Sequence, residues 1–182
     1  MTLYIIIGIA ALLIIYVLVT FNGFVRIRNK VNEAFSTMDV YLKKRWDLIP
    51  NIVETVKGYT KHEKTTFEEI IKLRNSAYDN MSDEQKIKTN EKLSKGITKI
   101  MALTEAYPDL KANESFKDLS NELTKVEDDI ANSRKYYNAV IRDFNNKVEM
   151  FPSNVIAKMF SYKTKKMFEA SADEKENVKV SL

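Results

Sequence analysis

The first 25 residues of the chain carry no charged side chain, and 20 of them are apolar. The uninterrupted part, Leu3 to Phe21, is nineteen residues long. A helix of that length spans roughly 29 Å, close to the ~30 Å hydrocarbon core of a bilayer. A lone segment in lipid must satisfy its own backbone hydrogen bonds, so a helix is the form expected. Residues 1–25 are therefore predicted to be a transmembrane anchor.

Two alternatives to an anchor fit the pattern less well. A cleavable signal peptide has a basic start, an apolar core of 7–15 residues and a small-x-small cleavage site. The segment has no Lys or Arg, its apolar run is longer, and no A-x-A pattern follows it. A buried helix of a soluble core is the second alternative, and 25 residues without a charge argue against it.

From Val31 onward, apolar residues recur at alternating steps of four and three. The stripe consists of Val31, Phe35, Met38, Leu42, Ile49, Ile52, Val56 and Tyr59. Such a stripe is typical of a helix that packs at a shallow angle in a bundle. The phase survives Pro50, so we expect a kink near Asp47 rather than a break. We expect this helix to continue directly from the anchor, with Gly58 as the one stop signal before Asn75.

A second helix is predicted from about Asp83 to Ala106. Ser82 is a good N-cap, and Gln85 is placed to complete a capping box. Tyr107-Pro108-Asp109 ends the helix, and residues 109–115 are expected to be a short polar connection.

A third helix is predicted from near Glu114, with an apolar seam of about five heptads that reaches Val148. Residues 151–154, Phe-Pro-Ser-Asn, stop it. We expect Ser153 or Asn154 to cap a last short helix that ends near Phe160.

These patterns predict an all-α protein, with an N-terminal transmembrane helix followed by an antiparallel bundle of three to four long helices. Residues 1–25 form the anchor, residues 26–168 the helical bundle, and residues 169–182 a polar tail that we expect to be disordered. The long seams could pack within one chain or between chains, so a homo-oligomer is compatible with the pattern.

Charge changes the picture by giving the anchor a direction. All 54 charged side chains and the net charge of +4 follow residue 25, and Arg26, Arg28 and Lys30 come directly after the apolar run. The positive-inside rule then predicts a cell-membrane protein with its short N-terminus outside and its domain in the cytoplasm. These three cations are also placed to meet anionic lipid headgroups of the bilayer. The 25 acidic residues are interspersed with the basic ones, so we expect no nucleic-acid binding.

Candidate chemistry is sparse. The chain has no Cys and one His, His62, followed by Glu63 but by no second histidine four residues later. A zinc site or a nucleophilic triad therefore lacks its other members. The four glycines are isolated, so there is no phosphate loop. We predict no catalytic residue, no cofactor and no metal.

Arg45 is the most informative polar residue, because it fills the one gap in the first apolar stripe. A buried guanidinium needs an acidic partner, and the acidic run Glu127-Asp128-Asp129 is a candidate. Three interpretations stay open: an ion pair that sets the helix register, a side chain turned to solvent, or an anchor for a ligand or lipid headgroup.

Several blocks of the chain resemble the LemA family of bacterial membrane proteins. They are Asn32 to Val53 (NEAFSTMDVYLKKRWDLIPNIV), Val56 to Glu63 (VKGYTKHE), Tyr136 to Asn145 (YYNAVIRDFN) and Phe151 to Asn154 (FPSN). The resemblance implies a single-pass protein with an outward N-terminus and a helical bundle, and it implies no activity. It draws attention to Arg45, Asp47, Pro50, Asn51, His62, Glu63, Tyr137, Asn138 and Asn145.

Our leading functional hypothesis is a non-enzymatic, membrane-tethered module that binds a protein partner or acts as a scaffold. The alternative is a sensor or relay, in which a ligand or lipid event shifts the bundle. A hydrolase that uses His62 and Glu63 is a third hypothesis, and it is the least supported by the sequence.

Overall fold

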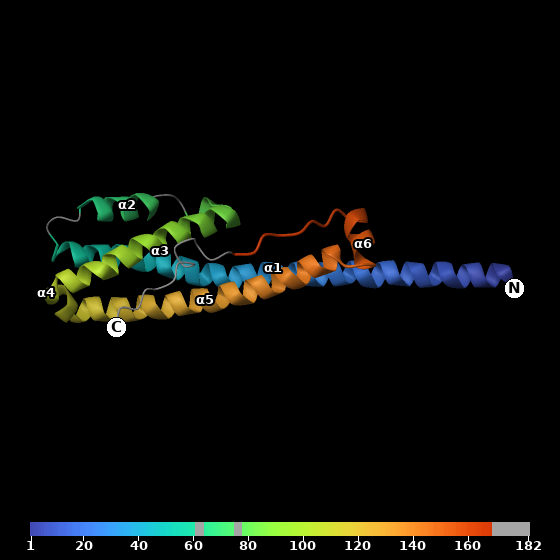
Figure 1. Ribbon diagram of the computed structural model, residues 1–182, viewed down its shortest axis with the longest axis horizontal. Coiled ribbons are helices and arrows are strands. Elements are labelled where there is room, and N and C mark those ends of the chain that lie inside the picture. Colours follow the sequence, from blue (N-terminus) through green and yellow to red (C-terminus); the bar gives the residue numbers. More distant parts are fainter. Residues whose placement is uncertain (61–63, 75–77, 169–182) are drawn as a thin grey trace, which may run out of the picture. The chain divides into compact units, whose positions relative to one another are not determined.

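The computed structural model describes residues 1–60, 64–74 and 78–168. The regular elements of the described residues are all helices, with no strand, and these residues form two compact units. The elements are α1 (Thr2–Lys57), α2 (Lys64–Arg74), the 3-10 helix η1 (Tyr78–Asn80), α3 (Asp83–Ala106), α4 (Pro108–Ala112), α5 (Glu114–Glu149) and α6 (Ser153–Met159), shown in Figure 1. Both α1 and α5 contribute residues to each unit.

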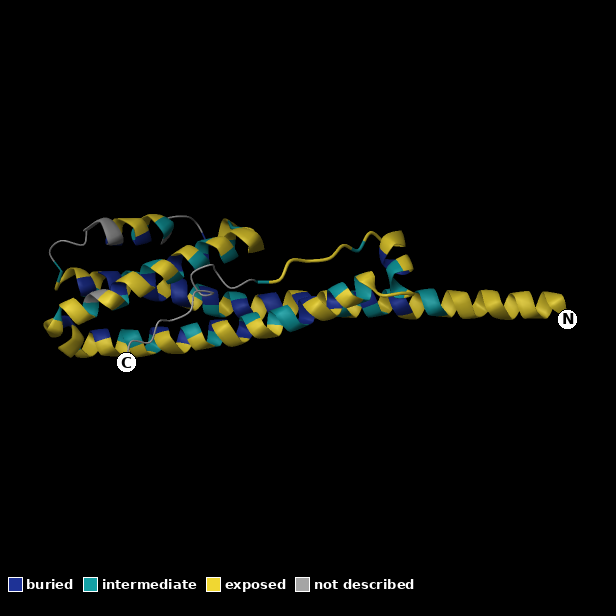
Figure 2. Cartoon of the chain, in the orientation of Figure 1, coloured by how far each residue is buried: buried dark blue, intermediate teal, exposed yellow. Residues whose placement is uncertain are grey.

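Helix α1 is 56 residues long and continues through Pro50. It is apolar enough near the N-terminus to cross a membrane, as the sequence predicts. Residues 1–15 are exposed throughout (Figure 2), including large apolar side chains such as Leu12 and Leu13. The predicted apolar stripe is buried from Val31 to Val56. Its last predicted member, Tyr59, lies after the end of α1 and is 38% exposed, so the stripe ends earlier than predicted.

The first unit contains residues 1–38 and 132–169. Its core consists of Phe24, Val31 and Ala34 of α1, Val140, Ile141 and Phe144 of α5, and Ile156 and Ala157 of α6. Tyr162 closes this core, because its ring stacks on that of Phe24 with centroids 4.6 Å apart. The core therefore reaches from α1 across α5 to α6 and the segment after it.

The second unit contains residues 39–131 and is built around apolar side chains of α1, α2, α3, α4 and α5. Trp46 and Tyr78 meet with ring centroids 5.1 Å apart, and they attach η1 to α1. The buried apolar residues include Leu42, Ile49, Ile52, Val56, Phe67, Ile70, Leu93, Ile97, Ile100, Leu110, Phe116, Leu123, Val126 and Ile130.

Several predicted boundaries are confirmed. Helix α3 begins with a capping box in which Ser82 and Gln85 satisfy each other's backbone N–H groups, and it ends at Ala106. Helix α5 starts at Glu114.

Three expectations differ from the structure. Helix α1 ends at Lys57 before Gly58, so the helical pattern that continues toward Asn75 belongs to the separate helix α2. The connection at 109–115 contains the short helix α4, because Pro108 can occupy a first helical turn. Helix α6 starts at Ser153 without a side-chain cap; the Ser153 hydroxyl donates to the carbonyls of Lys147 and Met150. The polar tail 169–182 lies outside the described residues.

Candidate functional site

Arg45 lies at the centre of a polar network inside the second unit, and none of its surface is exposed. Its Nη1 donates to both carboxylate oxygens of Glu127, at 2.8 and 2.9 Å, and to the hydroxyl of Ser94 at 2.6 Å. Its Nη2 donates to the backbone carbonyl and the side-chain oxygen of Asn90, both at 2.8 Å. One guanidinium thus joins α1 to α3 and α5.

The composition of this network explains how a charge is tolerated in the core. Removing a guanidinium from water costs several kcal/mol unless its donors are satisfied. The Glu127 side chain is 37% exposed, so one partner keeps contact with water while the other is fully buried. Glu127 belongs to the acidic run that the sequence suggested as a partner. Of the three interpretations of Arg45, the structure therefore agrees with the ion pair.

A second polar cluster lies beside this network and centres on Asp39. Its carboxylate accepts hydrogen bonds from the Tyr78 hydroxyl and from the Lys86 ammonium, both at 2.7 Å. The Lys86 ammonium also lies 4.9 Å from the centroid of the Tyr78 ring. Burial, followed by the hydrogen bond to Asp39, raises the pKa of Tyr78 well above its usual range, so this phenol stays a proton donor.

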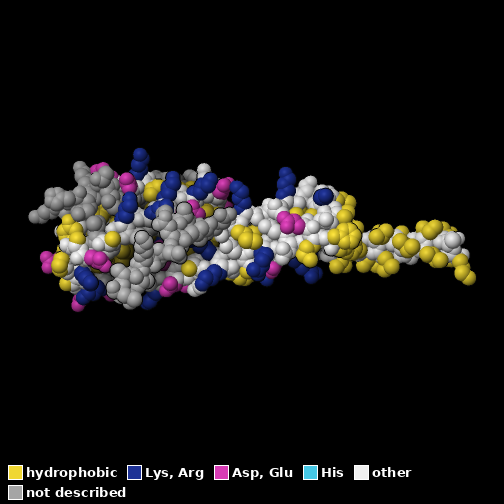
Figure 3. All heavy atoms as spheres, in the orientation of Figure 1, with side chains coloured by type: hydrophobic (Ala, Val, Ile, Leu, Met, Phe, Trp, Pro, Cys, Tyr) yellow, Lys and Arg dark blue, Asp and Glu magenta, His cyan; other side chains and the backbone are white. Residues whose placement is uncertain are grey.

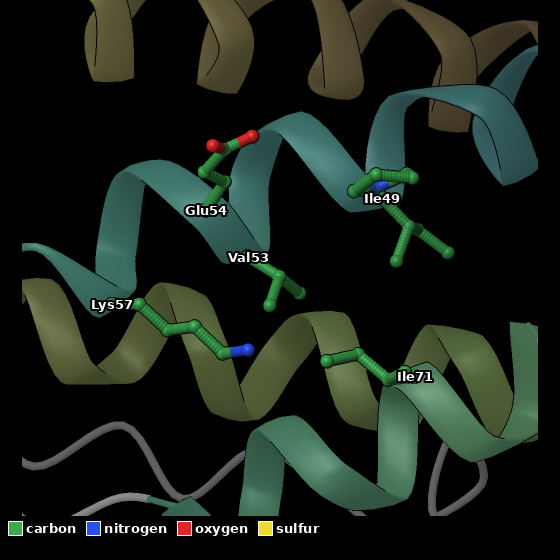
Figure 4. Close-up of a pocket in the computed structure, with 6 residues that line it drawn as sticks. Ile49, Val53, Glu54, Lys57 and Ile71 are labelled. Carbon is green, nitrogen blue, oxygen red and sulfur yellow. The ribbon is translucent and has the colours of Figure 1, made fainter.

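An open groove of about 390 Å³ lies between α1 and α2. Figure 4 shows that Ile49 and Val53 of α1 point toward Ile71 of α2, while the carboxylate of Glu54 points away. Pro50 and Lys57 complete the lining. Pro50 therefore lines an open groove at the surface of the second unit.

A larger groove, of about 550 Å³, lies between α2 and α3. Its apolar floor is formed by Ile70 and Leu73, and Gly96 lets the two helices approach, because a Cβ atom there would lie 2.8 Å from Cγ1 of Ile70. Four lysines line it against one acidic residue, Glu69; they are Lys72, Lys92, Lys95 and Lys99. Lys and Arg side chains also gather on the visible face over α2 and α3 (Figure 3).

The remaining predicted residues of the second unit do not join the Arg45 network. Asp47 is exposed and pairs with Lys43 one turn earlier, at 2.7 Å. Asn51 is exposed, and its backbone carbonyl accepts a hydrogen bond from the Thr55 hydroxyl. His62 and Glu63 lie outside the described residues.

Tyr137, Asn138 and Asn145 instead hold an extended segment against α5 in the first unit. Asn138 donates through Nδ2 to the carbonyl of Phe168 and accepts from its N–H, both at 2.8 Å. Asn145 makes the same pair of bonds with the backbone of Lys165. The Tyr137 ring meets that of Phe168 with centroids 5.3 Å apart. In the structure these three residues therefore hold the chain after α6 against α5.

Within the parts of the chain that the structure describes, no group of three or more His, Cys, Asp or Glu side chains converges to hold a metal ion. The lysine-lined groove was not predicted from the sequence. Lys92, Lys95 and Lys99 recur at steps of three and four, which places them on one helix face and is a signal that could have revealed it.

Comparison with known proteins gives one family and a small set of relatives. The model of the LemA family matches residues 34–182. Protein LemA of Metamycoplasma hominis is 27% identical over 164 residues, which covers 88% of this chain and 74% of that protein. The magnetosome proteins MamQ 1 and MamQ 2 of Paramagnetospirillum magneticum are each 30% identical over 71 residues, 39% of this chain and 26% of their own length.

Proposed function

The chain belongs to the LemA family, and from that premise we propose that it is a non-enzymatic, single-pass membrane protein whose helical domain docks an acidic segment of a partner protein. The observation that carries the proposal is the groove between α2 and α3. Its apolar floor and four lysines suit a helix or peptide with an apolar face flanked by Asp and Glu.

The architecture proposed for the domain is an antiparallel bundle of three to four helices. Three observations support it within the second unit. Arg45 of α1 binds residues of both α3 and α5. Lys44 of α1 lies 3.2 Å from the carboxylate of Glu122 of α5. The α1 and α5 segments of this unit run in opposite directions in Figure 1. A bundle of this kind presents grooves between neighbouring helices, where partner segments commonly bind.

We propose that the N-terminus faces outward and that the domain lies in the cytoplasm at the cell membrane. Arg26, Arg28 and Lys30 directly after the apolar run support this direction. The chain has no Cys, so the exposed residues Thr2 and Ser36 can be replaced one at a time by Cys. A membrane-impermeant maleimide on intact cells should label Thr2→Cys and should label Ser36→Cys only after lysis. The reverse pattern would contradict the proposed orientation.

The test of the docking site uses the full chain in nanodiscs and a defined probe. The probe is a synthetic amphipathic helical peptide with Leu on one face and Glu on the other, and its control is the same peptide with Lys in place of Glu. We expect the acidic peptide to bind, and added salt to weaken its binding, because the contacts are between exposed charges. Equal binding of the acidic and basic peptides would contradict the proposal.

A matched pair of variants ties that binding to the groove. Lys92→Glu with Lys99→Glu should weaken binding of the acidic peptide at least tenfold. Lys88→Glu with Lys125→Glu makes the same change in net charge at exposed positions outside the lining, and it should leave the dissociation constant within about twofold. Equal losses in the two variants would mean that the peptide responds to net charge alone.

The relay alternative rests on the kinked helix expected to continue from the anchor and on the polar residue Arg45 in its apolar stripe. Helix α1 does continue from the apolar run through Pro50, while the ion pair of Arg45 with Glu127 supports a structural role for that residue.

A further inference from the structure

Large apolar side chains crowd the surface of α6 and the turn that precedes it. Helix α6 buries Ile156 and Ala157 against the first unit, yet its other face is also apolar. Exposed patches of this kind mark sites that bind another apolar surface. The exposed residues are Met150 at 62%, Phe151 at 82%, Val155 at 56%, Met159 at 59% and Phe160 at 43%.

The position of α6 along α1 indicates which apolar surface this patch contacts. The Phe160 ring packs on the ring of Phe21, with centroids 4.6 Å apart, and Phe21 is the last residue of the apolar run. Tyr16 and Val17 are half-buried against the core cluster that contains Ile156 and Ala157. Tyr16 precedes Phe21 by five residues, which is about 7.5 Å along a helix.

This depth matches a known mode of membrane contact. Amphipathic helices that lie in the membrane plane bury their apolar face roughly 5–10 Å into the boundary between headgroups and acyl chains. If the nineteen-residue run fills the hydrocarbon core, whatever packs on residues 16–21 lies inside that boundary. Figure 1 shows α6 beside α1, and the contact of Phe160 with Phe21 places it at the C-terminal end of this run.

Cationic side chains lie at the same level. The Lys147 ammonium lies 5.2 Å from the centroid of the Phe24 ring and fills the space left open by Gly23. Burial lowers the pKa of Lys147, and the nearby charge of Arg26 lowers it further. Lys158 is exposed on α6 itself. Lys147 and Arg26 are near enough for the charge of one to affect the other, and both lie next to an apolar surface. Cations in such a place are suited to bind the phosphate groups of anionic phospholipids.

We propose that α6 and residues 150–152 form a second membrane-binding element, which inserts its exposed apolar side chains into the bilayer interface while Arg26, Lys147 and Lys158 contact anionic headgroups. This inference rests on the proposed membrane anchor but not on the proposed protein partner. The occupant of the patch is the bilayer, because the patch is continuous with the apolar surface of α1 through the contact between Phe21 and Phe160.

The test places single cysteines in the full chain and labels each with an environment-sensitive fluorophore. The test sites are Phe151→Cys and Val155→Cys. Leu13→Cys reports on the anchor, and Val40→Cys is the matched control, because Val40 is apolar and 66% exposed but lies in the second unit. The protein is placed in nanodiscs of phosphatidylcholine and phosphatidylglycerol, with or without spin-labelled lipids that quench fluorescence near the acyl chains.

We expect labels at 13, 151 and 155 to be quenched several-fold more by the spin-labelled lipids than the label at 40. Quenching at 13 together with values at 151 and 155 equal to that at 40 would overturn the inference and leave the anchor intact; a partner protein or a second copy would then be the occupant. Lack of quenching at 13 would overturn both the proposed anchor and the inference about α6.

The headgroup contact is tested separately with the label at 155. Replacing phosphatidylglycerol by phosphatidylcholine should increase quenching of this label by aqueous acrylamide, a neutral quencher, because α6 loses its electrostatic attraction to the headgroups. Lys147→Gln with Lys158→Gln should produce the same increase in phosphatidylglycerol nanodiscs, whereas Lys88→Gln with Lys125→Gln should not. Identical acrylamide quenching in both lipids would overturn the anionic-headgroup part of the proposal.

Discussion

The side-chain amide of Asn145 pairs with both backbone polar groups of Lys165, and Asn138 does the same with Phe168. The two asparagines are seven residues apart on α5, about 10.5 Å along the helix axis. Lys165 and Phe168 are three residues apart in an extended segment, which spans about 10 Å. This match of spacings lets a helix side present two amides to a chain that runs antiparallel to it.

The first prediction concerns these amides. Asn145→Ala should raise the hydrogen-exchange rate of the Lys165 amide to that of an unprotected amide and destabilise the segment by about 1–3 kcal/mol, since two hydrogen bonds are lost. Asn146→Ala, at the exposed neighbouring position, is the control and should leave exchange at Lys165 unchanged. An unchanged Lys165 rate in Asn145→Ala would mean that the segment is held by its aromatic contacts instead.

Arg45 should be the most sensitive position of the second unit. Arg45→Met leaves the buried Asn90 and the partly exposed Glu127 without their partner, so we expect a loss of up to about 3 kcal/mol of unfolding free energy. Arg45→Lys should recover little of it, because an ammonium cannot donate to both carboxylate oxygens and to Asn90 in the same geometry. Chemical denaturation of the full chain in detergent measures the loss.

A double-mutant cycle with Glu127→Gln isolates the ion pair within that loss. The two substitutions should be clearly non-additive, because each removes the same interaction. Additive effects would show that Arg45 stabilises the unit through Asn90 and Ser94 alone.

Lys147 should make stability depend on pH in the alkaline range. Its folded pKa is lowered below the unfolded value, so the unfolded chain binds more protons between the two, and this group's contribution to stability rises with pH across that window. Lys147→Met removes the desolvated charge and should therefore be more stable than wild type at neutral pH in zwitterionic detergent. Thermal melts from pH 7 upward should show this advantage shrinking as the pH approaches the ordinary lysine pKa. A constant difference would contradict the lowered pKa.

Ser161 ends α6 in a left-handed conformation, with φ of 59°. The N–H of Tyr162 bonds to the carbonyl of Ala157, and that of Ser161 to the carbonyl of Lys158, which is the Schellman arrangement. A residue with a Cβ atom pays roughly 1–2 kcal/mol in this conformation. Ser161→Gly should therefore stabilise the first unit by about 1 kcal/mol, and Ser161→Val should destabilise it, both measured by thermal melting.

Two glycines inside helices should respond to alanine in opposite ways. At Gly96 the new methyl group would lie 2.8 Å from Cγ1 of Ile70, so α2 must move away and the second unit should lose stability. At Gly23 the new methyl group meets only the flexible end of Lys147. There the improved helix propensity, up to about 1 kcal/mol, should dominate. Melting temperatures that fall for both variants would show that the space beside Gly23 is not adaptable.

Periodicity in the sequence predicted the helical elements well because each long helix buries one continuous face. The stripe from Val31 to Val56 is buried as expected, and the capping box at Ser82 marked the start of α3 within one residue. The gap at Arg45 left a buried ion pair, a solvent-facing side chain and a ligand anchor as alternatives, and the acidic run that was offered as a candidate partner contains Glu127, to which Arg45 is bound.

The features that the sequence did not predict are those that leave no repeating pattern of apolar side chains. The segment that contains Lys165 and Phe168 is extended and has no apolar alternation, so its docking on α5 depends on backbone groups that no side-chain pattern reports. Helix α6 is apolar on both faces, so its two kinds of contact could not be separated from the sequence. The spacing of Lys92, Lys95 and Lys99 marks a charged face of α3, but the groove itself also depends on how closely α2 approaches that face, which the pattern of α3 does not report.

The return of the chain along α5 has a practical consequence for attaching probes. Phe168 is held beside Asn138, eleven residues before α5 ends, which is about 16 Å along the helix from the turn that leads into α6. A small probe attached at Lys166, an exposed residue of this segment, would thus sit on the flank of α5 rather than at the turn that leads into α6. A probe at this position should report on the protein without interfering with the membrane contact proposed for α6.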